Sequence, residues 1–113
     1  MEFKIAGMII ASENAERAGI NAGKLAGLFG LSRASDENFE IADDTVRFAK
    51  VKQYGRAGSF IVVTEDLERA VAYLKERGAE FIEESARYDK NGELSLIYLD
   101  CVISGFAIRL EKK

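Results

Sequence analysis

Apolar and polar positions along this chain follow two periods, and the same succession of periods occurs twice. Residues 5–10 and 60–63 are short, continuous apolar runs rich in β-branched side chains, which predicts two buried strands. After each run, apolar residues recur every three or four positions, as on one face of a helix. The predicted buried face of the first helix consists of Ala15, Ala18, Ala22, Leu25 and Phe29. That of the second helix consists of Leu67, Ala70, Val71 and Leu74.

The entrances to the two predicted helices contain nearly the same residues. Alignment of GMIIASENAERA (7–18) with SFIVVTEDLERA (59–70) gives five identities in twelve positions, where average composition gives about one. Ser12 and Thr64 are the predicted N-caps, because a hydroxyl at that position accepts a backbone N–H of the first turn. A glycine after each helical period predicts the helix end. The recurrence indicates that one strand–helix unit is used twice.

Three strand-like runs follow each predicted helix. They lie at 31–35, 39–42 and 45–51 in the first half, and at 80–88, 94–100 and 106–111 in the second. The chain therefore predicts a single domain of two βαβββ modules, residues 1–52 and 59–113, joined by a linker at 53–58. A ferredoxin-like domain, such as an ACT regulatory domain, is the alternative, but it has about four strands in the order βαββαβ.

Gly19, Gly23 and Gly27 lie beside the buried face of the first predicted helix, spaced by four residues. Each costs about 1 kcal/mol relative to alanine in a helix interior, so their presence needs a reason. Close packing of the helix on the sheet is the favoured interpretation. A helix–helix contact between subunits is the alternative.

Composition narrows the classes of function. The net charge of −3 and the scattered basic residues give no nucleic-acid footprint, and the N-terminus resembles neither a signal peptide nor a membrane span. Cys101 is the only cysteine, which fits the reducing cytoplasm, and its apolar surroundings predict a buried side chain. The chain has no histidine, which excludes Ser-His and Cys-His catalysis.

Two tandem βαβββ modules resemble the vicinal-oxygen-chelate superfamily, which includes glyoxalase I, bleomycin-resistance proteins and extradiol dioxygenases. The resemblance rests on MIIASENAERA, FEIADDTVRFAKV, FIVVTEDLERAVAYLKERGAEF and GFAIRL. Residues 72–110 are similar to the C-terminal accessory domain of some 2-keto-3-deoxy-6-phosphogluconate / 4-hydroxy-2-oxoglutarate aldolases. The resemblance implies an α+β fold in which a curved mixed sheet forms a central cup, with the helices outside. It also implies a homodimer and a possible aldolase partner.

The superfamily holds a divalent metal in the cup, near the start of the first strand and inside the last strand of each module. The resemblance assigns these positions to Gly7, Arg47, Ser59 and Arg109. None of the four is a good metal ligand, and the two arginines would repel a cation. We therefore expect no metal and no other cofactor, and no metal-dependent lyase or dioxygenase activity from this chain alone.

Strand alternation indicates what the cup holds instead. Arg47 and Arg109 are predicted to face the cup, while their apolar neighbours face the helices. They could form a clamp for an anion, with Ser59 and Tyr98 as further ligand-binding residues. Tyr98 is placed by a predicted common face of Leu94, Leu96, Tyr98 and Asp100. The alternative is that each arginine pairs with an internal acid such as Glu40, Glu93 or Asp100, or reaches solvent.

Three functions remain open at this point. The chain could bind a small anionic metabolite, a keto acid or a sugar-acid phosphate, as an accessory or sensor module of keto-acid and aldolase metabolism. It could be a divergent lyase or isomerase that uses Tyr or Glu as acid or base. It could also be a structural oligomerisation domain. We expect a cytoplasmic protein with no nucleic-acid or membrane partner.

Overall fold

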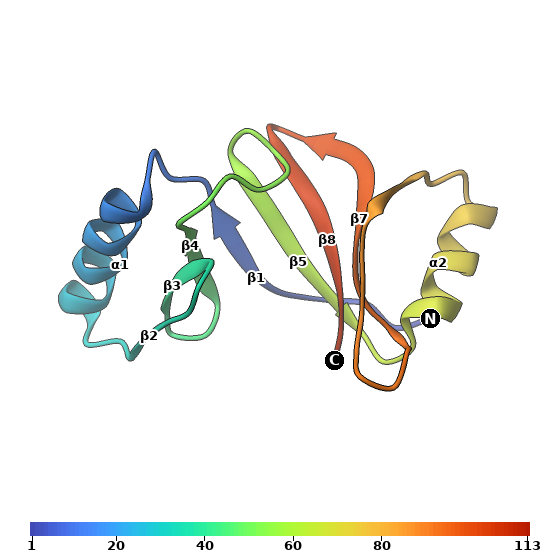
Figure 1. Ribbon diagram of the computed structural model, residues 1–113, viewed down its shortest axis with the longest axis horizontal. Helices are drawn as coiled ribbons and strands as arrows, with labels where there is room; N and C mark the ends of the chain where they lie inside the picture. The colour runs from blue at the N-terminus through green and yellow to red at the C-terminus, as the bar shows by residue number, and fades with distance from the viewer.

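The computed structural model describes residues 1–113 as two βαβββ modules that share one eight-stranded mixed sheet (Figure 1). Module 1 contains β1 (Lys4–Ile10), α1 (Ala15–Phe29), β2 (Arg33–Ser35), β3 (Phe39–Ala42) and β4 (Val46–Ala49). Module 2 contains β5 (Gly58–Thr64), α2 (Leu67–Glu76), β6 (Phe81–Tyr88), β7 (Leu94–Ile103) and β8 (Phe106–Lys112). The strand order is β2-β3-β4-β1-β5-β8-β7-β6. The predicted α+β fold of two tandem modules is confirmed.

The modules meet edge to edge at the centre of the sheet, where β1 and β5 pair in antiparallel fashion. Within each module the last strand pairs in parallel with the first. The registers match, because Ile9 lies beside Arg47 and Ile61 lies beside Arg109. Since Ile9 and Ile61 are aligned in the repeat, the two arginines occupy equivalent positions in the two modules.

Both helices are capped two residues after the predicted positions. The side chain of Asn14 accepts a hydrogen bond from the backbone N–H of Arg17 at 2.8 Å, and that of Asp66 accepts one from the backbone N–H of Arg69 at 3.1 Å. The predictions of Ser12 and Thr64 as caps are therefore wrong. The Thr64 hydroxyl instead donates to the carbonyl of Glu2 at 2.8 Å. Asn14 and Asp66 are themselves aligned in the repeat, so the alignment is in the right frame and only the capping position differs.

The core lies on both faces of the sheet. On the outer face α1 packs against Phe48, and α2 covers a cluster of Leu67, Phe81, Leu94, Ile97 and Leu110. On the inner face, a third cluster spans the junction of the modules; it consists of Ile9, Phe39, Ala49 and Ile61. The helices lie at opposite ends of the molecule (Figure 1), and the inner face between them carries a cavity lined largely by polar side chains beside this cluster.

The predicted buried face of α1 is partly wrong. Ala18, Ala22 and Ala26 are buried, whereas Ala15 is exposed and Phe29 is 70% exposed. The three alanines recur every four residues and bring the helix close to the sheet, which turns its last residue away.

Neither helix of the structure has the length and apolar character needed to cross a membrane.

The glycines of α1 do not pack on the sheet. A Cβ added at Gly19 or Gly27 would meet no atom within 4 Å, and one at Gly23 would meet only the guanidinium of Arg33 at 3.3 Å. The interpretation of close helix–sheet packing at these positions is therefore wrong. The alanine face makes that contact, and a Cβ on the glycine face would meet at most the end of one side chain.

The predicted common face of β7 holds for only part of its length. Leu96 and Tyr98 face the inner side, but Leu94 lies in the outer cluster under α2. The pairing of β6 with β7 shifts register at Arg87, which places Leu94 on the other face. A second shift follows Leu99, and beyond it Asp100 and Cys101 are exposed. The prediction of a buried cysteine is therefore wrong.

Candidate functional site

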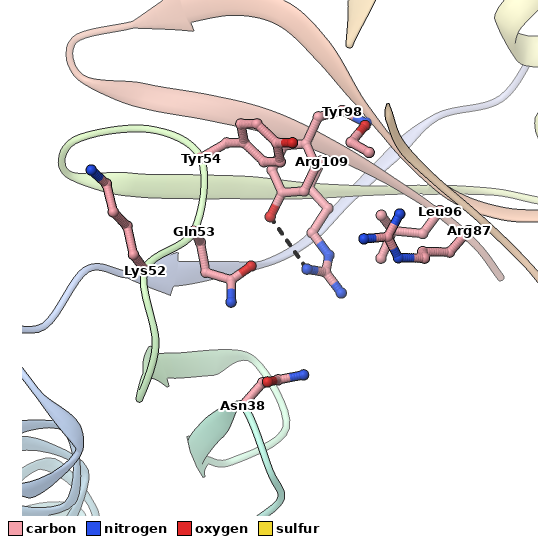
Figure 2. Close-up of a pocket in the computed structure, with 9 residues that line it drawn as sticks. Asn38, Lys52, Gln53, Tyr54, Arg87, Leu96, Tyr98 and Arg109 are labelled. Carbon is pink, nitrogen blue, oxygen red and sulfur yellow. Dashed lines mark hydrogen bonds between the residues drawn. The ribbon is translucent and has the colours of Figure 1, made fainter. Parts of the chain in front are cut away.

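A cavity of about 610 Å³ lies on the inner face of the sheet, and we call it the cup cavity (Figure 2). Its wall draws on the turn before β3, the linker and the strands β6, β7 and β8. The residues that line it are Asn38, Lys52, Gln53, Tyr54, Ser85, Arg87, Leu96, Tyr98 and Arg109. Three of these are cations and none is an acid, so the wall suits an anion.

Arg109 and Tyr98 form the centre of this wall. The Arg109 Nη1 donates to the Tyr98 hydroxyl oxygen at 3.2 Å, as the dashed line in Figure 2 shows. Tyr98 is only 2% exposed, and its ring lies 4.7 Å from the ring of Tyr54, centroid to centroid. Because Tyr98 accepts from the guanidinium, its own O–H proton remains available to a ligand.

Arg47 and Arg109 share a single carboxylate. The Nη1 and Nη2 of Arg47 donate to Oε2 and Oε1 of Glu111 at 3.0 and 3.2 Å, and the Nε of Arg109 donates to Oε2 at 2.7 Å. Two guanidinium groups and one carboxylate leave a net charge of +1. The Nη2 of Arg109 donates no hydrogen bond within the chain, so this edge is the free part of the group.

The environment of Glu111 keeps it ionised. Burial alone would raise its pKa, but the hydrogen bond from Arg47 and the charges of both arginines outweigh burial and lower the pKa below the ordinary 4.5. Both guanidinium groups also lie over the ring of Phe39, at 5.6 and 5.5 Å from its centroid. Ion pairs and cation–π contacts therefore hold both arginines in fixed orientations.

Both arginines do pair with an internal acid, but not with one of the three that the sequence suggests. Glu40 forms ion pairs with Arg33 and Lys50, and Glu93 pairs with Lys112. Asp100 is exposed beyond the second register shift of β7. Glu111 takes their place, because it lies on β8 two residues after Arg109 and thus on the same face.

The four predicted ligand-binding residues have different positions. Arg109 and Tyr98 line the cup cavity and contact each other. Arg47 faces the same side of the sheet but turns toward Glu111 and is not part of the cavity wall. Ser59 is fully buried, and its hydroxyl donates to the carbonyl of Tyr54 at 3.2 Å. It holds the linker against the sheet and does not line the cavity.

The sequence patterns did not predict several of the residues that line the cup cavity. Asn38, Lys52 and Gln53 come from turns and the linker, which carry no periodicity to orient them. Arg87 is aimed at the cavity by the register shift of β6, and its Nη1 donates to the carbonyls of Glu84 and Ala86 at 3.0 and 2.9 Å. No pattern in the sequence indicates that shift.

The residues at the superfamily's metal positions do not fit a divalent metal. Gly7 has no side chain, and a Cβ there would lie 2.2 Å from the carbonyl oxygen of Thr45, so this position excludes any ligand residue. The nearest carboxylate, that of Glu111, accepts hydrogen bonds from two cations that repel a metal. The structure contains no group of three or more His, Cys, Asp or Glu side chains placed to hold a metal ion.

Comparison with known proteins gives matches among solved structures alone. No protein-family model matches the sequence, and no curated protein matches it at a significant level. The chain is similar to a hypothetical protein from Bacillus halodurans C-125, with a TM-score of 0.69 and 13% identity over 100% of this chain and 96% of that one.

Two structures of methylmalonyl-CoA epimerase define the class of fold. A variant of the Streptomyces coelicolor enzyme, in complex with 2-nitronate-propionyl-CoA, gives a TM-score of 0.63 at 13% identity, over 97% of this chain and 96% of that one. A methylmalonyl-CoA epimerase in complex with methylmalonyl-CoA and NH4+ gives a TM-score of 0.63 at 13% identity, over 100% of both chains. This chain therefore has the glyoxalase-like, or vicinal-oxygen-chelate, fold that was expected. Identity this low shows the fold alone.

Proposed function

We propose that this chain is a metal-independent binding domain for a small organic anion, a keto acid or a sugar-acid phosphate, held in the cup cavity. The observation that carries the proposal is the cavity wall, in which Lys52, Arg87 and Arg109 face a concave space that no carboxylate lines. The chain as a whole has a net charge of −3, so this local excess of cations is a property of the site and not of the protein.

The arrangement suits a carboxylate in particular. The free edge of Arg109 and the Tyr98 hydroxyl lie side by side and can donate to the two oxygens of one anionic group. Asn38 and Gln53 on the opposite side offer amide groups for the rest of the ligand (Figure 2). Leu96 is the only aliphatic residue in the cavity wall, which favours a short, polar molecule over a lipid-like one.

The comparisons support a small-molecule ligand. The epimerases with this fold are in complex with methylmalonyl-CoA or 2-nitronate-propionyl-CoA, so proteins of this fold can bind small molecules. The aldolase-accessory role, the homodimer and the cytoplasmic location stay predictions from the sequence.

Isothermal titration calorimetry with pyruvate, 2-oxoglutarate and gluconate tests the proposal. We expect at least one of these anions to bind, and the Arg109→Gln variant to weaken its binding about 10- to 100-fold, since a charge-assisted hydrogen bond contributes about 1.5–3 kcal/mol. Arg47 still pairs with Glu111 in this variant, so the fold is retained.

Lys24→Gln is the matched control, because Lys24 is an exposed cation on α1, outside the cavity wall. Its removal changes the net charge by the same amount and should leave the Kd unchanged. The proposal is wrong if none of the three anions binds at millimolar concentration, or if both variants weaken binding equally.

A further inference from the structure

A second cavity, of about 550 Å³, lies between the linker and the loop that joins β1 to α1, and we call it the linker cavity. Its floor includes Ile9 of the central sheet, and its rim includes Ser12, Lys52, Gln53 and Arg56. Lys52 and Gln53 also line the cup cavity. The two cavities therefore adjoin each other at Lys52 and Gln53.

Residues that line the linker cavity carry polar groups that have no partner in the protein. The backbone N–H groups of residues 51–56 donate no hydrogen bond within the chain, and five of these six residues line the cavity. The hydroxyl of Ser12 is buried and unpaired, and no other buried side-chain polar atom in the structure lacks a partner. Buried polar groups in folded proteins are normally satisfied, so an unpaired one needs a partner that the chain does not supply.

The charge of the linker cavity is positive. Lys52 and Arg56 take part in no ion pair, whereas Lys50 beside them is held by Glu40 at 3.4 Å. Glu13 is the one acid on the rim. Free backbone N–H groups combined with unpaired cations form the kind of concave surface that binds phosphate oxygens.

The linker is held in this shape by its glycines. Gly55 and Gly58 have φ values of 85° and 137°, which residues that carry a side chain rarely adopt. A Cβ at Gly58 would lie 1.9 Å from the carbonyl oxygen of Ile9, and one at Gly55 would lie 2.1 Å from that of Gly58. The donors of the linker are thus presented by a backbone that is packed against the sheet, before any ligand arrives.

We infer that the linker cavity is a second anion subsite, which takes the phosphate group of a ligand whose carboxylate lies in the cup cavity. The inference rests on the proposed function and narrows it to one chemical class. The ligand is a phosphorylated organic acid whose two anionic groups are separated by several carbon atoms, so that the molecule passes Lys52 and Gln53 to reach both cavities. Arg109 binds the carboxylate end, and Ser12, Arg56 and the linker N–H groups bind the phosphate end.

Gluconate and 6-phosphogluconate form a matched pair of probes, because they differ only in the phosphate. We expect calorimetry to give a Kd for 6-phosphogluconate at least tenfold below that for gluconate. Arg56→Gln and Ser12→Ala should reduce this ratio to about twofold or less and leave the Kd for gluconate unchanged. Arg109→Gln should weaken both ligands by the same factor and preserve the ratio. Ser12→Ala removes an unpaired hydroxyl, so its Tm should not fall below that of the unmodified protein.

The outcomes separate the subsite from the proposed function. If gluconate binds and the phosphate adds nothing, or if Arg56→Gln leaves the ratio intact, the linker subsite is wrong and the cup site stands. If the phosphate effect disappears in Arg109→Gln but not in Arg56→Gln, the phosphate lies in the cup and the inference is overturned. If neither compound binds but pyruvate or 2-oxoglutarate does, the inference is wrong and the cup site stands. If none of the four compounds binds, both proposals fail.

Discussion

Replacing Glu111 by glutamine removes the one negative charge between two arginines and keeps the size of the side chain. The amide oxygen can still accept a hydrogen bond, but Arg47 and Arg109 lose their shared counter-charge. Removing one partner of a buried ion pair costs about 3–5 kcal/mol. The three side chains retain between 12% and 23% exposure, and water recovers part of the loss, so we expect about 2–3 kcal/mol.

Thermal unfolding followed by circular dichroism measures the effect. The entropy of unfolding is about 2.1 cal/mol/K per residue, or roughly 0.24 kcal/mol/K for this chain, so the Tm of Glu111→Gln should fall by about 8–12 °C. Glu83→Gln is the matched control, because Glu83 pairs with Lys75 at 3.7 Å on the surface and both side chains are more than half exposed. Its Tm should change by less than about 2 °C.

The pH dependence of the Tm difference between the unmodified protein and Glu111→Gln shows whether the charge of Glu111 causes the loss of stability. The pKa of Glu111 is lowered in the folded protein, so its contribution to stability is complete above the ordinary value of 4.5. That contribution is lost as the pH falls through the lowered pKa, because the carboxyl then resembles glutamine in charge. The Tm difference between the two proteins should be largest at pH 7 and shrink toward pH 3. A difference that is absent at pH 7, or equally large at both pH values, would refute the assignment of the effect to charge.

Further predictions concern the cavity wall, the glycines and the caps. Tyr98→Phe should weaken binding of the cup anion roughly tenfold by calorimetry, with a smaller loss of stability of about 1 kcal/mol, because it removes the hydroxyl bonded to Arg109. Gly27→Ala should raise the free energy of unfolding by about 1 kcal/mol in urea titration, since a Cβ there meets open space; a decrease would contradict the placement. Gly58→Ala should destabilise by more than about 3 kcal/mol, because its Cβ would overlap a backbone oxygen. Asn14→Ala and Asp66→Ala should each cost about 1 kcal/mol in the same titration, and unchanged midpoints would exclude them as caps.

The repeat predicted the fold most reliably, because both of its copies encode the same local structure. The aligned segments 7–18 and 59–70 each encode a strand that enters a helix, and two copies of such a unit pair at the first strand of each. Alternation along the last strands placed Arg47 and Arg109 on the inner face correctly. These are local properties, which the order of apolar and polar residues records directly.

The errors came from contacts that local patterns do not record. Arg47 and Glu111 are 64 positions apart, and the pairings of β4 with β1, β1 with β5 and β5 with β8 bring them together. Leu94 and Cys101 were misplaced by two register shifts in β7, each of which changes the face on which the next residues lie. Phe29 was expected to be buried because it continues the apolar period of the helix, but three alanines determine which face of α1 contacts the sheet.

The single carboxylate between two equivalent arginines has a consequence for how a ligand enters the cup. The strand order is the same outward from the β1–β5 seam on both sides, so the sheet has an approximate twofold axis there. Counting from Arg47 and Arg109, the counterpart of Glu111 in the first module is Ala49. A fully symmetric cup would accept a molecule in two opposite orientations with equal affinity. One acid in one module removes that degeneracy, so an asymmetric ligand of the proposed cup site would bind in a single direction.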